Sequence, residues 1–521
     1  MKQKVPNLAK GWTSAPLGEI AETASGGTPR RGRKEFFGGS IPWVKSGELN
    51  DATLNASEEF LTNLGLQSSS AKVFPAGTLC IALYGATVGR LAILGKEAAT
   101  NQAVCGIFVP PLIDTDYLFY FLLWQRKNLI ELGKGGAQPN ISQEIIRRVV
   151  VPLPPSKEQT RIASKIEELV TQLDAGVEEL RKARAQLKRY RQAVLKAAVT
   201  GELTKEWREA HKDELEPASE LLARILKERR AKWEAEQLAK MTATGKKPST
   251  YDWKNKYQEP TSPDAHILPA LPSGWIWSAF GQAFRVYVGA TPSRQRKTYW
   301  NGHLSWASSS EVAFCRIKST RETITELGLQ NTSTDLHPAG TVLLGMIGEG
   351  KTRGQAAILD ISACNSQNSA AIRVSEAGIP PEYIYYYLQG EYERTRKLGS
   401  GNNQPALNKS RVQGMTFPLP PLAEQNEIVQ EVDRLLSIAD TIQQSIEKEL
   451  IQADRLRQSI LKRAFEGKLV PQYPNDEPAE LLLERIKTER AKREAENQAK
   501  MKLNRKRSAK NRPNPTERPA A

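Results

Sequence analysis

The chain carries the same long segment twice, and this internal repeat limits the possible folds more than any other feature. Because a repeat builds the same unit more than once, it has to be recognised before any short motif is interpreted. Matching segments follow one another in the same order in both copies: GWTSAPLGEI at Gly11 and GWIWSAFGQA at Gly274, TPRRGRKEFFGGSIPW at Thr28 and TPSRQRKTYWNGHLSW at Thr291, LGLQ at Leu64 and Leu327, PAGT at Pro75 and Pro338, VPLPPSKEQTRI at Val151 and FPLPPLAEQNEI at Phe417, and ERRAKWEAEQLAKM ending at Met241 and TERAKREAENQAKM ending at Met501. The sequence therefore predicts two similar halves related by an internal pseudo-two-fold repeat.

The stretch GMIGEGKT, Gly345 to Thr352, fits the phosphate-binding pattern G-x-x-x-x-G-K-[ST] and follows an apolar run. In the first copy its place is taken by ALYGATVG, Ala82 to Gly89, which has no Gly-Lys-Ser/Thr. A phosphate-binding loop needs the lysine on the phosphates and the hydroxyl on magnesium. What the copies share is only a glycine-rich turn between apolar runs, so a tight turn or hairpin is favoured over an ATPase site.

Each copy has two parts of different character. The first part mixes short apolar runs with Gly, Pro and Asn turns, which is typical of a compact α+β domain. After Pro154-Pro155 and Pro420-Pro421, about forty residues without proline have apolar side chains at steps of three and four, which predicts a long helix with a coiled-coil seam. The seam positions are Ile162, Ile166, Leu169, Leu173, Val177, Leu180, Leu187 and Val194, and then Ile428, Val432, Leu435, Ala439, Ile442, Ile446, Ala453 and Ile460.

The helix ends carry their own signals. Ser156 with Gln159 predicts a capping box at the start of the first long helix. Gly201 and Gly467 stand where a glycine ends a helix. Helices of roughly 60 Å cannot fold inside a small domain. We therefore expect an α+β protein in which two mixed globular domains are joined by two long helices that pair as a coiled coil, with their domains at opposite ends if the helices run antiparallel.

This interpretation divides the chain into six segments. They are a first globular domain at residues 1–155, a central long helix with a short amphipathic helix at 156–240, a linker at 241–273, a second globular domain at 274–421, a second long helix with a short amphipathic helix at 422–500, and a basic, disordered tail at 501–521. The apolar face of each short helix either packs on its own protein or docks a partner subunit.

Charge points to a polyanionic partner. Lysine and arginine total 74 against 58 acidic residues, a formal charge of +16, which favours nucleic acid, although composition alone does not separate DNA from RNA or acidic lipid. The four cysteines are scattered, so neither a structural zinc nor a disulfide framework is expected. With no apolar span or signal peptide in the sequence, a cytoplasmic protein is expected.

The two copies also suggest which residues bind. Contacts to DNA phosphates position a protein and should be the same in both copies, whereas contacts that read bases should differ. The matched basic residues Arg31, Arg33 and Lys34, and Arg294, Arg296 and Lys297, are the phosphate candidates, although a charge run is as often a solvated surface. The divergent candidates for base edges are Arg30 and Lys45 in the first copy and Gln295, Lys351 and Arg353 in the second.

Two glutamines and the aromatic residues near the basic run are less certain. Gln138 and Gln404, each before a proline in a glycine-rich loop, either reach DNA or make a loop hydrogen bond. Aromatic side chains of this kind are more often core than stacking platforms, so core positions are expected for Trp43, Trp306, Phe36 and Tyr299.

The order and duplication of the GW start, the G-x-T-P turn and the PLPP-x-x-EQ junction resemble the DNA specificity (S) subunit of type I restriction-modification systems, from Gly11 to Met501. The resemblance implies a non-catalytic subunit for defence against foreign DNA. Its two target recognition domains, residues 1–155 and 274–421, would each bind one half of an asymmetric bipartite DNA site. The two long coiled-coil helices would run antiparallel and act as a ruler between them.

The resemblance also implies the partners. Two methyltransferase (M) subunits would use S-adenosylmethionine to methylate adenine N6, and restriction (R) subunits would hydrolyse ATP with magnesium. The chain itself has no N/D-P-P-F/Y tetrapeptide of adenine methyltransferases, so no cofactor is expected on it. The alternatives are an enzyme, either an ATPase or a methyltransferase, and a coiled-coil scaffold without a DNA role.

Overall fold

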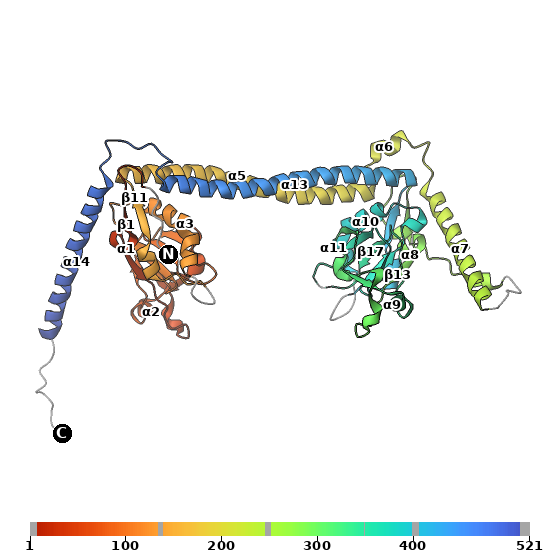
Figure 1. Ribbon diagram of the computed structural model, residues 1–521, viewed down its shortest axis with the longest axis horizontal. Helices are drawn as coiled ribbons and strands as arrows, with labels where there is room; N and C mark the ends of the chain where they lie inside the picture. Colours follow the sequence, from red (N-terminus) through yellow and green to blue (C-terminus); the bar gives the residue numbers. More distant parts are fainter. Residues whose placement is uncertain (1–7, 134–138, 245–251, 349, 399–405, 511–521) are drawn as a thin grey trace, which may run out of the picture. The chain divides into compact units, whose positions relative to one another are not determined.

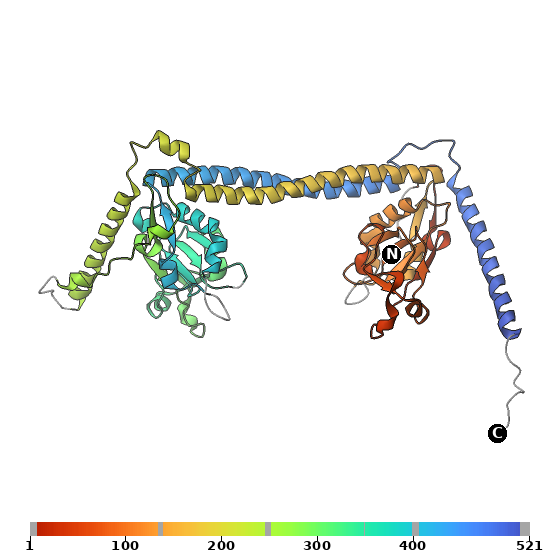
Figure 2. The same ribbon diagram turned by 180° about the vertical axis from the view of Figure 1, so that it is seen from behind.

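The computed structural model describes residues 8–133, 139–244, 252–348, 350–398 and 406–510, and of residues 497, 498 and 500–510 it describes the backbone alone. The chain divides into two compact units. Unit 1 is Met1–Arg181 with Glu447–Ala521, and unit 2 is Lys182–Ile446. Each unit therefore contains one globular domain and a part of each long helix (Figures 1 and 2).

The globular domain of unit 1 is built on a five-stranded sheet of order β2-β10-β7-β8-β4, with a four-stranded sheet β5-β3-β9-β6 and the pair β1-β11. Its strands are β1 Thr13–Pro16, β2 Glu22–Ser25, β3 Phe37–Val44, β4 Ala52–Leu54, β5 Glu59–Leu61, β6 Val73–Phe74, β7 Leu79–Ala82, β8 Leu91–Leu94, β9 Ala98–Thr100, β10 Val104–Phe108 and β11 Val150–Leu153. Its helices are α1 Leu17–Ile20, α2 Asn63–Gln67, α3 Thr115–Leu132 and α4 Gln143–Arg148.

The globular domain of unit 2 repeats this architecture. It has a five-stranded sheet β13-β20-β17-β18-β15, a three-stranded sheet β16-β14-β19 and the pair β12-β21. Its strands are β12 Ile276–Ala279, β13 Val286–Val288, β14 Trp300–Ala307, β15 Cys315–Ile317, β16 Glu322–Ile324, β17 Val342–Gly345, β18 Ala356–Leu359, β19 Ala363–Asn365, β20 Ser369–Ile372 and β21 Thr416–Leu419. Its helices are α8 Phe280–Ala283, α9 Glu326–Gln330, α10 Pro381–Gly390, α11 Tyr392–Lys397 and α12 Lys409–Gln413. The predicted α+β repeat is confirmed.

The segment that fits the phosphate-binding pattern is a hairpin connection. Strand β17 before it pairs antiparallel with β18 after it, and the equivalent strands β7 and β8 do the same in unit 1. A phosphate-binding loop leads from a strand into a helix, whose N-terminus faces the phosphates. Since a strand follows here, the prediction of a hairpin is confirmed.

The two long helices are α5 Ser156–Thr200 and α13 Leu422–Phe465, with 45 and 44 residues. Two ion pairs join these helices: Asp174 pairs with Arg457 in unit 1, and Arg191 Nη2 lies 2.6 Å from Asp440 Oδ1 in unit 2. The later residue of α5 thus pairs with the earlier residue of α13, which is the order of an antiparallel pair. The predicted long antiparallel helices are confirmed.

One seam position was wrong. Ile442 is 46% exposed, although Ala439 and Ile446 on either side of it in the seam are buried. A heptad step of four from Ala439 reaches Gln443, and Gln443 accepts a hydrogen bond of 3.2 Å from Arg191. Because Ile442 is apolar and directly precedes Gln443, the sequence pattern assigned the seam position to Ile442 instead of Gln443.

The predicted capping box is also wrong. Ser156 donates to the carbonyl of Leu112, at 3.4 Å. The Gln159 side chain donates to the carbonyl of Pro154 at 3.0 Å and accepts from the backbone of Asp114. Gln159 thus secures the entry to the helix by holding two neighbouring backbone groups. The glycine stops hold, because Gly201 and Gly467 both have positive φ, 75° and 68°.

The helices α7 Ala218–Ala243 and α14 Ala479–Lys510 each pack on the domain of their own unit. Leu221 and Ile225 of α7 lie in the core of unit 2, and Leu482 and Ile486 of α14 lie in the core of unit 1. Of the two alternatives for these apolar faces, packing on the same protein is the one observed.

An arginine fixes each of these helices to a short helix of its domain. Arg229 of α7 donates to the carbonyls of Gly281, Gln282 and Phe284 at 2.6–3.2 Å. Arg490 of α14 donates to the carbonyl of Gly18, which is equivalent to Gly281. The sequence match that ends at Met241 and Met501 pairs Arg230 with Arg490 instead, so the structural register differs from it by one residue.

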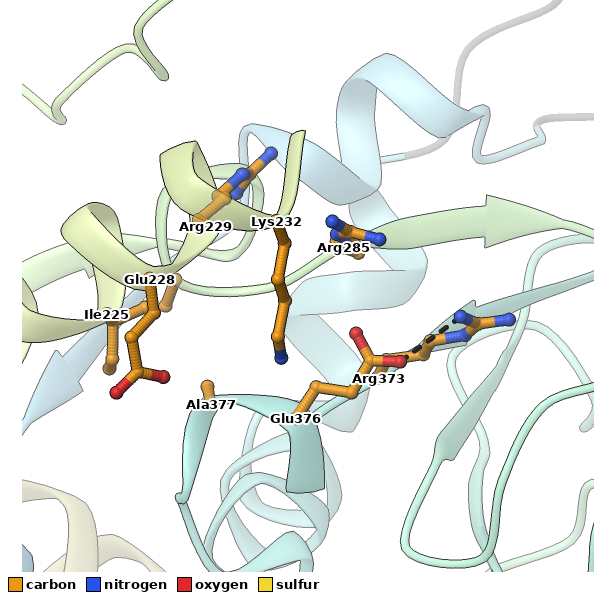
Figure 3. Close-up of a pocket in the computed structure, with 9 residues that line it drawn as sticks. Ile225, Glu228, Arg229, Lys232, Arg285, Arg373, Glu376 and Ala377 are labelled. Carbon is orange, nitrogen blue, oxygen red and sulfur yellow. Dashed lines mark hydrogen bonds and ion pairs between the residues drawn. The ribbon is translucent and has the colours of Figure 1, made fainter. Parts of the chain in front are cut away.

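A small polar cavity lies where α7 meets its domain (Figure 3). It is lined by Glu228, Arg229 and Lys232 of α7 and by Arg285 and Glu376, among others. Lys232 points into it, while Arg373 pairs with Glu376. Its volume of about 30 Å³ holds about one water molecule, so the cavity is a seam between packed elements rather than a ligand site.

Part of the segment predicted as a linker, 241–273, packs against α7. The short helix η3, Asp252–Lys256, brings Trp253 to a stacked contact with Trp233 of α7, with ring centroids 6.0 Å apart. Trp277 also donates to the carbonyl of Pro269, at 2.8 Å. Across the part of the chain that the structure describes, no helix is both long and apolar enough to cross a bilayer.

Candidate nucleic-acid interface

The basic run of each copy forms a tight turn that enters a short 3-10 helix. In unit 1, Arg33 N–H donates to the carbonyl of Arg30 at 3.0 Å, and η1, Lys34–Phe36, follows. In unit 2, Arg296 N–H donates to the carbonyl of Ser293 at 3.1 Å, and η5, Lys297–Tyr299, follows. We call residues 30–36 and 293–299 the basic turns; their backbones are built in the same way.

The repeated LGLQ segment holds the basic turn in place. It forms α2 in unit 1, where Thr62 caps the helix by accepting from Gly65 N–H at 3.1 Å and donates to the Glu35 carbonyl at 2.8 Å. Gly65 lies so close to Phe36 that a Cβ atom on it would collide with the Phe36 carbonyl oxygen. The repeat therefore needs glycine at this place because the turn lies directly on the helix.

Unit 2 makes the same contacts with α9. Thr325 accepts from Gly328 N–H at 3.1 Å and donates to the Thr298 carbonyl at 2.8 Å. A Cβ atom on Gly328 would likewise collide with the carbonyl oxygen of Tyr299. The position of the basic turn on its domain is thus fixed twice by the same interactions.

A buried tryptophan also packs against each basic turn, since the guanidinium groups of Arg31 and Arg294 lie over the rings of Trp43 and Trp306. Trp43 is 1% exposed and donates from Nε1 to the Gly27 carbonyl at 3.1 Å. Trp306 is 2% exposed and donates to the Ala290 carbonyl at 3.0 Å. Tyr299 is also buried, and Phe36 is half-buried. Both tryptophans and Tyr299 are therefore core residues, as predicted, and Phe36 lies at the edge of the core.

One arginine of each basic turn folds onto a glutamate of a neighbouring strand, β5 in unit 1 and β16 in unit 2. Arg31 Nη1 lies 2.5 Å from Glu59 Oε2, and its guanidinium carbon lies 4.7 Å from the Trp43 ring centroid. Arg294 forks onto Glu322 and lies 3.9 Å from the Trp300 ring centroid. These hydrogen bonds lower the pKa of both carboxyls. Each arginine thus orders its turn, while its side chain stays about half exposed, at 54% and 56%.

The remaining candidates in the basic turns are exposed. Arg33 pairs with Glu35 at 3.1 Å, and Arg296 lies 5.7 Å from the Tyr299 ring centroid. The other four side chains are exposed, and within the described residues no hydrogen bond or ion pair of theirs is found: Arg30, Lys34, Gln295 and Lys297. They are the turn residues most available to a ligand.

Lys45 differs from its equivalent in the second copy. Its ammonium lies 3.0 Å from Glu59 and 3.1 Å from Glu58, and these hydrogen bonds raise its pKa. Ser308, its equivalent, instead bonds to Glu311 at 2.9 Å. Lys45 thus has local partners that a DNA contact would have to share or displace.

The candidates in the glycine turn and the glutamines lie differently. Lys351 is exposed, and its carbonyl accepts a hydrogen bond of 2.7 Å from Tyr392. Arg353 is 9% exposed, which makes it the least accessible of the candidates that the structure describes. Gln138 and Gln404 lie outside the described residues.

The motifs at the two ends of each domain meet at a buried carboxylate. In unit 1, Trp12 of the GW start donates to Glu158 of the PLPP-x-x-EQ junction at 3.1 Å. In unit 2, Trp275 donates to Glu424 at 2.7 Å, and Glu424 also accepts from Thr204 and Arg208 at 2.7 and 2.6 Å. Glu424 is fully buried. These motifs therefore fasten each domain to its long helix.

A buried histidine network lies in the domain of unit 2. His337 is 0% exposed; its Nε2 lies 3.0 Å from Asn365 Oδ1, and its Nδ1 accepts from Arg373 at 3.2 Å. Burial, and next the Arg373 charge, lower the pKa of His337 to about 4. Phe74 holds the equivalent place before the repeated PAGT and packs edge-on against Phe108.

The histidine predicts an acid-sensitive second domain. Between an ordinary pKa near 6.5 and about 4, the unfolded chain binds a proton that folded His337 does not. The free energy of unfolding of unit 2 should therefore fall by up to about 3 kcal/mol as the pH falls from 6.5 to 4. Hydrogen exchange of β17 against its counterpart β7 measures this difference. In the variant His337→Gln the histidine contribution should vanish, and an unchanged pH profile in that variant would assign the sensitivity to other groups.

Two equivalent domains, each with a basic turn on its surface, fit the class of proteins that carry paired nucleic-acid recognition domains. The family model of the type I restriction modification DNA specificity domain matches residues 9–182 and again residues 272–452. The chain therefore belongs to the DNA specificity subunits of type I restriction-modification systems, and it is a DNA-recognition subunit rather than a catalytic one.

Known proteins of this family are similar to most of the chain. The Escherichia coli type I restriction enzyme EcoDI specificity subunit is 28% identical over 74% of this chain and 79% of its own length. The StySPI specificity subunit of Salmonella potsdam is 24% identical over 93% of this chain and 96% of its own. The crystal structure of the HsdS subunit from Thermoanaerobacter tengcongensis has a similar fold, with a TM-score of 0.52 and 18% identity over 90% of this chain and all of that one.

Proposed function

We propose that the two basic turns each bind the phosphate backbone at one half of a bipartite DNA site. The observation that carries this proposal is the duplication of a rigid turn whose backbone is fixed by the same contacts in both domains. A duplex presents equivalent phosphates at two successive sites, so paired domains suit two half-sites. The long helices α5 and α13 would then set the length of the unread spacer.

Within this proposal the residues fall into two groups. Arg33 and Lys34, with Arg296 and Lys297, contact phosphates, and Arg31 and Arg294 support them from their stacked positions. Side chains that differ between the copies read bases, because only base contacts carry sequence information. The divergent candidates are Arg30, Lys45, Gln295, Lys351 and Arg353, of which Arg30, Gln295 and Lys351 are exposed. Gln138 and Gln404, which match between the copies, would reach either bases or the DNA backbone.

The chain would act within a larger complex in the cytoplasm. We propose that it directs two methyltransferase subunits, which methylate adenine N6, and restriction subunits to its DNA site. S-adenosylmethionine, ATP and magnesium would bind those partner subunits. Another solved structure of similar fold, with a TM-score of 0.57 and 18% identity, is described as showing complex assembly and conformational transition of the type I restriction-modification system. This description supports the proposal that the present chain assembles with partners.

Mapping of N6-methyladenine in the host genome tests this function. Long-read sequencing with and without the gene should show one bipartite motif that depends on this chain. The map also supplies the duplex needed for binding measurements. Loss of the gene with no change in the methylation pattern of an active system would contradict the proposal.

Exchange of one domain gives a sharper prediction. Replacing residues 11–151 with the equivalent domain of a relative should change one half of the methylated motif and leave the other half unchanged. The matched control replaces residues 274–417 and should change the opposite half. If either exchange altered both halves, the two domains would not read DNA independently.

A further inference from the structure

A leucine beside each basic turn is exposed without a packing role. Leu64 is 52% exposed and Leu327, its equivalent, is 49% exposed. They occupy the same position of the repeated LGLQ segment, in α2 and α9. In each unit these short helices lie at the end of the globular domain that points away from the long helices (Figure 1).

The second leucine of the same segment explains the structural need for an apolar residue. Leu66 packs against the buried cluster that contains Trp43 and Leu61, and Leu329 packs against the one that contains Trp306. Residues two apart in a helix point about 200° away from each other. The first leucine therefore points away from the core, and the fold does not require it to be apolar.

The exposed leucine is held at a fixed place. The threonine cap and the glycine contact described above tie α2 to η1 and α9 to η5. Leu64 thus lies on a helix that is held against η1, the part of the basic turn that begins at Lys34, and Leu327 lies on a helix that is held against η5, which begins at Lys297. A single exposed leucine needs no explanation. Here, however, the same apolar side chain is held beside a turn with exposed cations in both domains, and such a surface suits a ligand that is both negatively charged and apolar.

We propose that Leu64 and Leu327 enter a groove of the DNA duplex and make apolar contacts with bases while the basic turns hold the flanking phosphates. This rests on the proposed function of the turns. Duplex DNA combines a charged backbone with apolar groove surface, and proteins use leucine there as a wedge between base steps or against thymine methyl groups. A protein partner suits the surface less well, because the cores of protein interfaces are depleted of lysine.

The test compares leucine variants of the full-length chain on the duplex that methylation mapping identifies. Leu64→Ala and Leu327→Ala should each bind about tenfold more weakly, which is about 1.4 kcal/mol, with an unchanged dependence on salt because no charge is removed. The control Leu481→Ala removes a leucine that is also 49% exposed but lies on α14, and it should bind as the parent does. Leu64→Met should retain most of the affinity.

The outcomes separate this inference from the proposed function. If the parent chain does not prefer the mapped duplex over a scrambled one, the proposed function fails. If the parent does prefer it and both alanine variants bind within twofold of Leu481→Ala, the groove contact is overturned. Replacing thymine by deoxyuridine in the half-sites then locates a confirmed contact: the leucine effect disappears if it touches thymine methyls and persists if it wedges between bases.

Discussion

Replacing Arg208 by alanine should destabilise unit 2 by about 3–5 kcal/mol. The variant leaves the Glu424 carboxylate buried without its cationic partner, since Arg208 Nη1 lies 2.6 Å from Glu424 Oε1 and the Glu424 side chain is 0% exposed. Removing one member of a buried pair costs far more than the pair itself contributes, because the remaining charge stays desolvated. Arg208 also donates to the Gly201 carbonyl at 3.0 Å, so the end of α5 loosens with it.

Hydrogen exchange read separately in the two units measures this effect, because local opening free energies can be assigned to individual strands. The strand pair β12-β21 should lose protection in Arg208→Ala while β1-β11 keeps it. The matched control in unit 1 is Gln472→Ala, whose side chain lies 3.5 Å from Glu158 and is neutral; its cost should stay below about 1 kcal/mol. Adding Glu424→Gln to Arg208→Ala should restore part of the loss. Equal protection in both units would refute the assigned role of Arg208.

Neutralising both basic turns should change the salt dependence of DNA binding more than any other substitution. The variant carries Arg33→Ala, Lys34→Ala, Arg296→Ala and Lys297→Ala. Each lost phosphate contact lowers the slope of log affinity against log salt by about 0.9, so the slope should fall by roughly 3.6. At low salt the affinity should drop by a hundredfold or more on target and random duplexes alike, because phosphate contacts carry no sequence information.

Fluorescence anisotropy across a salt series provides the measurement. The control variant changes lysines on the outer surface of a helix, Lys227→Ala and Lys240→Ala of α7, and should keep the parental slope. Neutralising only the turn of unit 1 should remove about half of the effect. A normal slope in the fourfold variant would show that the turns do not touch the backbone.

The sequence predicts the architecture well because its strongest signals are periodic or duplicated. The repeat and the apolar steps of three and four in α5 and α13 are long enough to survive local exceptions. The error at Ile442 shows the limit of prediction from periodicity, because an apolar residue beside the seam resembles a seam position. The exposure of Ile442 and the contact of Gln443 with Arg191 identify Gln443 as the seam residue.

The sites could be predicted only in part. The match between copies locates the basic turns, but it does not show that Arg31 and Arg294 fold onto Glu59 and Glu322, because those partners lie 28 positions further along the chain, on β5 and β16. The bond between Arg208 and Glu424 joins residues 216 positions apart. Nothing local marks Arg208 as a buried cation, because burial is a property of the packed fold.

The composition of unit 1 has a consequence for how the protein is made. Tyr117 and Phe121 pack edge-on against Phe465, with ring centroids 5.4 and 5.3 Å apart, and Phe465 lies on α13, which follows the whole globular domain of unit 2 in the sequence. During translation residues 8–153 of the unit 1 domain emerge before α13, and the core of that domain stays open until Phe465 has been added to the chain. The domain that is synthesised first is therefore the last to be completed, and its apolar side chains need shielding in the interval.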